Sequence, residues 1–69
     1  MATLVQRRKL ETRKLILDAA YQLFAEKGYA QATIDDIIRA CGVSKGALYH
    51  HFASKEELFK ALLEDRIRR

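Results

Sequence analysis

The fold is decided by residues 33–58, which read TIDDIIRACGVSKGALYHHFASKEEL. Apolar residues recur at helical spacing within this stretch, so we expect two short helices, one over 34–41 and one over 45–52. Only the turn Cys41–Ser44 joins them. A turn of three or four residues that contains glycine, set between two short helices, is typical of the helix-turn-helix motif.

Residues that favour helix ends flank both segments. Thr33 stands three residues before Asp36, a weak form of the capping box that begins a helix. Gly42 suits the left-handed position that ends one. Ser44 is the expected N-cap of the second helix. Its buried stripe is expected to consist of Leu48 and Phe52.

Two further helices extend the pattern on either side. Apolar residues at helical spacing predict a long amphipathic helix over about 8–27, which Gly28 ends. Ser54 and Glu57 form a second capping-box pattern, and a fourth helix is expected over 55–67. The predicted fold is therefore all-α, a small helical bundle with a homeodomain-like helix-turn-helix.

Length and composition exclude several classes of protein. The 69 residues suffice for one small domain with a modest core, and the single cysteine excludes an internal disulfide. No apolar run approaches the roughly 18 residues of a membrane span. The N-terminus lacks the pattern of a secretion signal, so we expect a cytoplasmic protein with no membrane contact.

The net charge of +4 is concentrated near the N-terminus. Residues 1–14 carry five basic residues against one acidic residue, and residues 1–7 are interpreted as a basic arm. Such an arm, with Arg7 at its end and Arg8 directly after it, suits DNA phosphates. It is equally compatible with a solvated helix end, and charge alone does not distinguish the two.

The helix over 44–52 carries the candidate base-reading residues, because the second helix of this motif enters the major groove with its first residues against the bases. Lys45 can reach a guanine edge or a phosphate, and Ala47 can touch a thymine methyl group. Gly46 costs roughly 1 kcal/mol relative to alanine within a helix and would let the backbone approach another surface closely. The alternative for Gly46 is simply a weakly helical first turn.

Other polar residues have both a DNA-binding and an ordinary structural explanation. Tyr49 can place its hydroxyl on a phosphate, or it is a half-buried aromatic with a solvated tip. Thr33 and Lys55 lie at helix starts, where exposed amides favour phosphate, but capping and solvated charge also explain them.

Three further features could suggest catalysis or metal binding, but neither a catalytic group, a metal nor a cofactor is expected. His50 and His51 are adjacent on a helix and point about 100° apart, so they cannot readily share a metal. Asp35 and Asp36 face different ways and fit stabilisation of a helix start. Cys41 falls on an apolar face and is most simply a core residue.

The run Thr33–Ile37, the run Cys41–Phe52 and the run Ser54–Leu58 closely resemble the N-terminal domain of TetR/AcrR-family transcriptional regulators. The segments Ile16–Ala20 and Lys27–Tyr29 fit the same pattern, and the resemblance covers about residues 8–63. The chain departs from it at Ile38 and Cys41, where family members often have alanine.

The resemblance implies a sequence-specific DNA-binding domain. By position it implies base or groove contacts from Lys45, Gly46 and Ala47. It implies phosphate contacts from Thr33, Ser44, Tyr49, His50, His51 and Lys55, helped by the basic arm with Arg7 and Arg8.

It also implies partners outside these 69 residues. Family members usually continue into a C-terminal domain that binds a small-molecule effector and forms a homodimer. We therefore expect residues 1–69 to be the DNA-binding domain of a longer regulator, most often a ligand-released repressor on a palindromic operator. By itself the chain is expected to be monomeric.

Two other classes of function compete with this interpretation. A protein-interaction or membrane-surface helix module is compatible with the basic arm, but it leaves the short turn and Gly46 unexplained. An enzyme is disfavoured, since the sequence contains no glycine-rich phosphate loop, metal-ligand spacing or catalytic triad pattern.

Overall fold

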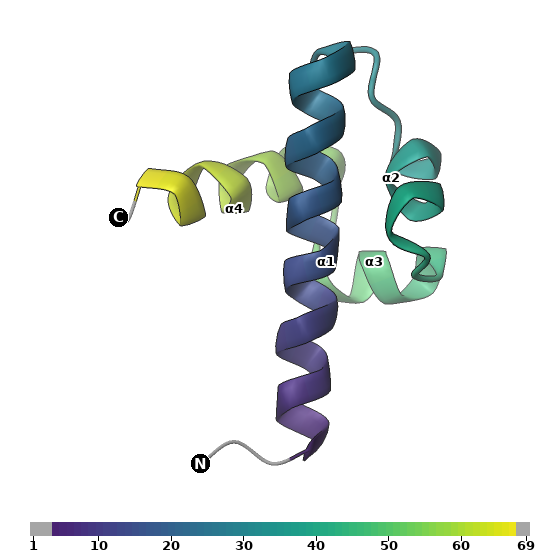
Figure 1. Ribbon diagram of the computed structural model, residues 1–69, viewed down its shortest axis with the longest axis vertical. Coiled ribbons are helices and arrows are strands. Elements are labelled where there is room, and N and C mark those ends of the chain that lie inside the picture. The colour runs from purple at the N-terminus through teal and green to yellow at the C-terminus, as the bar shows by residue number, and fades with distance from the viewer. Residues whose placement is uncertain (1–3, 68–69) are drawn as a thin grey trace.

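The computed structural model describes the backbone of residues 4–67, together with the side chains of residue 8 and residues 10–65. It contains four helices: α1 (Leu4–Lys27), α2 (Ile34–Cys41), α3 (Lys45–His51) and α4 (Lys55–Ile67). The long helix α1 forms the axis of the molecule, with α2 and α3 on one side of it, and α4 crosses behind it and projects from the other side (Figure 1). The predicted all-α bundle is confirmed.

One cluster of buried side chains holds the helices together. Every helix contributes to it, so the amphipathic stripes seen in the sequence meet at one place. The members expose at most 4% of their surface: Ile16, Leu17, Ala20, Ile37, Leu48, Phe52, Leu58 and Leu62.

The caps expected from the sequence define most helix ends. Gly28 and Gly42 both adopt positive φ, 86° and 75°, as expected of glycines that end α1 and α2. Ser54 Oγ accepts a hydrogen bond from the N–H of Glu57 at 3.1 Å at the start of α4. Among the described residues the second bond of this box, from the N–H of Ser54 to the Glu57 carboxylate, is not formed, and the carboxylate lies 3.8 Å from Lys60 Nζ.

Two predicted boundaries are wrong. Helix α1 begins at Leu4 rather than near residue 8, so residues 4–7 of the predicted arm are helical. Apolar periodicity marks only the part of a helix that packs, whereas residues 4–10 include no glycine or proline to stop the helix. Helix α3 ends at His51, and Phe52 is its extended C-cap, with φ −137° and ψ 121°, because the chain turns there to begin α4.

Candidate nucleic-acid interface

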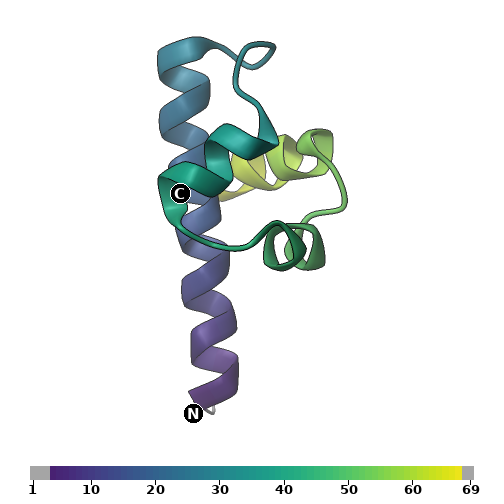
Figure 2. The same cartoon turned by 90° about the vertical axis from the view of Figure 1, so that its right-hand side faces the viewer.

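The turn between α2 and α3 has the local geometry that the motif requires. The N–H of Gly42 donates to the carbonyl of Ile38 at 2.8 Å and closes α2. Ser44 then caps α3, its Oγ accepting a hydrogen bond from the N–H of Ala47 at 3.1 Å. The Ser44 hydroxyl proton remains available to an acceptor such as a phosphate oxygen. Figure 2 views the molecule from the side on which α2 and α3 lie, with α1 behind α2.

The first turn of α3 is open to solvent. Its helix packs against the core through Leu48, while Lys45 and Gly46 are exposed and Ala47 is half-buried. A Cβ atom added at Gly46 would meet nothing within 4 Å. The packing of the protein therefore does not require glycine at this position.

Lys45 has a partner that the sequence did not indicate. Its Nζ lies 3.8 Å from Oδ1 of Asp35, and both side chains are largely exposed, at 63% and 69%. The pair joins the first residue of α3 to the first turn of α2. The ammonium group that is expected to read a base thus lies beside a carboxylate in the free protein.

The three aromatic residues of α3 differ in exposure to solvent. Tyr49 and His50 are exposed, Tyr49 by 43%, and the rings of His50 and His51 pack edge to face at 5.5 Å. His51 is half-buried and lies at the edge of an open groove of about 380 Å³.

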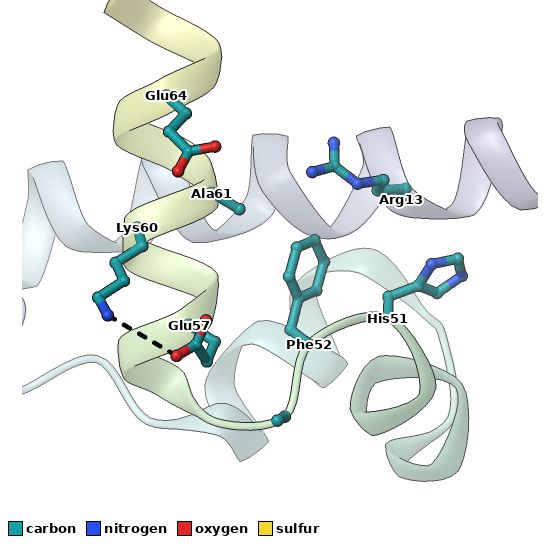
Figure 3. A pocket seen from close by; sticks show the side chains of 8 residues that line it. Arg13, His51, Phe52, Glu57, Lys60, Ala61 and Glu64 are labelled. Atoms are coloured by element: carbon teal, nitrogen blue, oxygen red, sulfur yellow. Dashed lines mark ion pairs between the residues drawn. The ribbon is translucent and has the colours of Figure 1, made fainter.

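That groove lies between α1, the end of α3 and α4 (Figure 3). Phe52 points toward α1, where the guanidinium of Arg13 lies 5.4 Å from the centre of its ring. Glu57, Lys60 and Glu64 line the opposite wall. The mixture of charges favours no single class of ligand.

Thr33 forms a complete capping box at the start of α2. Its Oγ1 accepts from the N–H of Asp36 at 3.0 Å, and Asp36 Oδ2 accepts from the N–H of Thr33 at 3.1 Å. The hydrogen bonds from Thr33, with a further contribution from Lys27 at 3.4 Å, hold the pKa of the Asp36 carboxyl below its usual value. Asp36 thus has the helix-start role expected of it.

Lys55 has a structural role that the sequence did not indicate. Its Nζ donates to the carbonyl oxygens of Tyr29 at 2.7 Å and Ala32 at 3.2 Å. It also lies 4.3 Å from the centre of the Tyr29 ring. Because an ammonium group has three donors, one N–H remains for a phosphate. No short sequence motif links a lysine to carbonyl groups more than 20 residues away.

The two arginines of the predicted arm lie on α1. Arg8 is exposed, and the side chain of Arg7 lies outside the described residues. No acidic residue occupies the first turn of α1. Arg7 and Arg8 are the fourth and fifth residues of α1, next to its N-terminal turn.

Among the described residues, no group of three or more His, Cys, Asp or Glu side chains could hold a metal ion. None of the helices described has the length and apolar character needed to cross a membrane.

Known proteins resemble the chain over most of its length. The chain is 45% identical over 60 residues to the A-factor receptor protein of Streptomyces griseus, covering 87% of this chain and 22% of that protein. It is 46% identical over 56 residues to the transcriptional regulator SrpR of Pseudomonas putida, covering 81% and 26%. It is 39% identical over 64 residues to the regulator AcrR of Shigella flexneri, covering 93% and 30%.

The chain thus spans about a quarter of the length of these relatives. No solved structure matches it significantly. Residues 16–62, well over half of the chain, match the family model for bacterial regulatory proteins of the tetR family. Such regulators are not enzymes, as expected for this chain. The chain belongs to the TetR family of bacterial regulatory proteins, whose helix-turn-helix domain binds DNA in the regulation of transcription.

Proposed function

We propose that residues 1–69 form one domain that reads a specific operator in double-stranded DNA, with α3 in the major groove. The observation that carries this proposal is the open first turn of α3. The helix packs inward through Leu48, while Lys45 and Gly46 face no part of the core. The first turn of a recognition helix is the part that meets the base edges.

The proposed base and groove contacts come from Lys45, Gly46 and Ala47. Lys45 binds the O6 and N7 atoms of a guanine once it leaves Asp35. Gly46 lets the α3 backbone approach the bases, which is supported by the empty space around it. Ala47 contacts a thymine methyl group.

The proposed phosphate contacts surround this centre and fix the orientation of α3 without reading sequence. Available donors support two of them: the hydroxyl proton of the exposed Ser44 and the remaining N–H of the half-buried Lys55. The residues assigned to phosphates are Thr33, Ser44, Tyr49, His50, His51, Lys55, Arg7 and Arg8.

The proposed regulatory role belongs to a longer protein that acts in the bacterial cytoplasm. There, two copies form a homodimer on a palindromic operator, with half-sites about 34 Å apart. The dimer represses transcription, and a small-molecule effector bound by another domain releases it from DNA. The relatives support regulation in general, since two of them are named as transcriptional regulators.

Selection of bound duplexes from a random pool, at about 50 and 200 mM salt, tests the proposal. We expect enrichment of one motif that persists at the higher salt. Either a single half-site or a palindrome supports the proposal, and a palindrome also gives the half-site spacing. Salt-sensitive binding without an enriched motif would reduce the proposal to electrostatic attraction by the basic residues. A folded chain that binds at neither salt concentration would favour a protein-interaction module instead.

A further inference from the structure

The two histidines of the chain, His50 and His51, are the last two residues of α3. Their rings pack edge to face with centres 5.5 Å apart, and His50 is exposed while His51 is half-buried. Histidine is the side chain whose charge ordinarily changes between pH 5 and 8. The end of α3, which carries proposed phosphate contacts, is therefore a place where the charge of the domain depends on pH near neutrality.

The charged groups around the pair leave room for an added positive charge. The groove beside His51 is lined by charged side chains of both signs: Arg13 from α1 and Glu57, Lys60 and Glu64 from α4 (Figure 3). Two are cations and two are carboxylates, so together they supply no net charge. No ion pair to His50 forms among the described residues. The carbonyl groups at the end of a helix favour a nearby cation.

A phosphate beside an imidazole favours the protonated ring. The neutral ring donates one hydrogen bond through its N–H, whereas the protonated ring donates two and carries a positive charge. An opposite charge within about 4–6 Å stabilises that charged form. Because the two rings lie 5.5 Å apart, a charge on one opposes a charge on the other. We therefore expect the pair to take up one proton more readily than two.

We propose that DNA binding by this domain is coupled to the uptake of a proton by His50 and His51. The bound state then holds more protons than the free state, so a lower pH favours binding. Affinity therefore rises as the pH falls from about 7.5 to about 6. Phosphates are present on every sequence, so the gain is similar on any duplex. This inference rests on the proposed function, because it assumes that the two histidines contact phosphates.

Fluorescence anisotropy of the 69-residue chain at about pH 6 and about pH 7.5, on the duplex recovered by selection, tests the coupling. We expect the affinity to be about three-fold higher at the lower pH. The salt dependence of binding should steepen by up to about one released ion, because one more phosphate is neutralised. Asp, Glu, Lys and Arg side chains ordinarily keep their charges over this range. Circular dichroism at each pH checks that the chain stays folded.

The double variant His50→Gln/His51→Gln removes both imidazoles and should lose the gain at low pH. The α-amino group also titrates in this range, but the variant retains it, so it cannot account for a difference. Tyr49→Phe is the matched control, because it removes an uncharged proposed contact from the same helix and keeps both histidines. It should bind more weakly than the unaltered chain and retain the dependence on pH.

Two single variants at the exposed position test the coupling without altering the half-buried His51, whose ring lies 6.2 Å from that of Phe52. His50→Gln should show a smaller gain at low pH than the unaltered chain. His50→Lys supplies a permanent charge. It should bind more tightly than the unaltered chain at about pH 7.5 and gain less from acidification.

The outcomes separate the inference from the function on which it depends. A gain that Tyr49→Phe keeps and the double variant loses supports the inference. An equal gain in the double variant, or equal affinities of the unaltered chain at both pH values, would overturn it. If the unaltered chain binds no duplex at either pH, the proposed function fails and the inference fails with it. If it binds scrambled and selected duplexes equally, sequence reading fails, whereas loss of the gain in the double variant still supports the coupling.

Discussion

Gly46 occupies the second position of α3 without any need for glycine in the protein itself. Its φ is not positive, and a Cβ atom there would meet no neighbour within 4 Å. The residue therefore makes the helix less stable than alanine would and gains nothing from internal packing. An external surface that approaches the α3 backbone gives glycine at this position a physical reason.

Gly46→Ala separates the stability of the domain from its binding to DNA. We expect the variant to unfold at a higher denaturant concentration, with a gain in the free energy of unfolding of up to about 1 kcal/mol. A methyl group forced into a packed contact costs about 1–3 kcal/mol, so affinity for the selected duplex should fall roughly five-fold or more. Chemical denaturation and anisotropy titration measure the two effects.

Two outcomes would contradict this account of Gly46. A variant that is more stable and binds the selected duplex as well as the unaltered chain would leave only the weakly helical first turn as an explanation. A variant that is less stable would show that the space around Gly46 is not open. Ala53→Gly, at an exposed position between α3 and α4, tests whether glycine content alone affects binding.

At the scale of the elements, the sequence predicts the helices best where caps define them. Thr33, Gly42 and Ser44 give the ends of α2 and the start of α3 to the residue, because each cap acts through its immediate neighbours. The start of α1 is missed, since no cap marks it and the apolar pattern begins later. Capping and periodicity are local properties that a sequence displays directly.

The sequence predicts the site less completely than the fold, because local patterns do not show contacts between helices. The sequence places Lys45 and Lys55 at helix starts, but it does not reveal that Asp35 pairs with one and that the loop carbonyls bind the other. These contacts depend on how the helices pack. They appear only when the whole arrangement is known.

The capping box of α2 makes stability depend on pH. The pKa of Asp36 is lower in the folded chain than in the unfolded chain, mainly because its carboxylate accepts hydrogen bonds from Thr33. Its contribution to stability is therefore fully present above the unfolded pKa, near 4, and is lost as the pH falls through the lower folded value. We expect Asp36→Asn to be less stable than the unaltered chain at pH 7 and to approach it near pH 3.

Denaturation curves at several pH values measure this difference. Asp35→Asn is a suitable control, because Asp35 lies in the same turn without joining the capping box. A difference between Asp36→Asn and the unaltered chain that stays constant from pH 7 to pH 3 would show that the ionised carboxylate does not stabilise α2.

The side chain of Lys55 connects the start of α4 to the loop between α1 and α2. The ammonium group bonds to two carbonyls of that loop, and it lies over the ring of Tyr29. Tyr29 in turn packs against Phe24 and Phe59, with ring centres 5.3 and 4.9 Å apart. One side chain thus fixes the loop that leads into the Thr33 cap.

Lys55→Met should loosen this junction, because methionine keeps the apolar stem and loses the donors. Hydrogen bonds from charged groups contribute about 1.5–3 kcal/mol, so we expect a loss of that order in the free energy of unfolding. The control Lys60→Met removes an exposed lysine of α4 and should change stability by less than about 0.5 kcal/mol. Equal stabilities for the two variants would show that the hydrogen bonds of Lys55 do not stabilise the domain. A lower salt dependence of DNA binding by Lys55→Met would show that Lys55 also contacts phosphate.

At the scale of the whole molecule, dimensions limit how two copies can share DNA. The longest extent of the chain is 38 Å, and α1 runs along it (Figure 1). The other extents are 29 and 18 Å. Half-sites one turn apart are separated by about 34 Å, which is less than the longest extent. Two copies on adjacent half-sites therefore do not fit end to end with α1 parallel to the duplex axis.

The surface of the described residues predicts that the 69-residue chain binds each half-site independently. The large exposed apolar side chains, Leu10, Leu15, Tyr21, Tyr49 and Leu63, are spread over three helices of the described part. Scattered apolar residues are normal on a monomer and do not form the patch of a stable interface.

We expect the chain to sediment as a monomer at micromolar concentration without DNA. On a palindromic duplex, two copies should bind without cooperativity, each with the affinity measured on an isolated half-site. Sedimentation together with titration of half-site and palindromic duplexes makes both measurements. A dimer in the absence of DNA, or steep cooperative filling of the palindrome, would show that the two copies contact each other through a surface of these 69 residues.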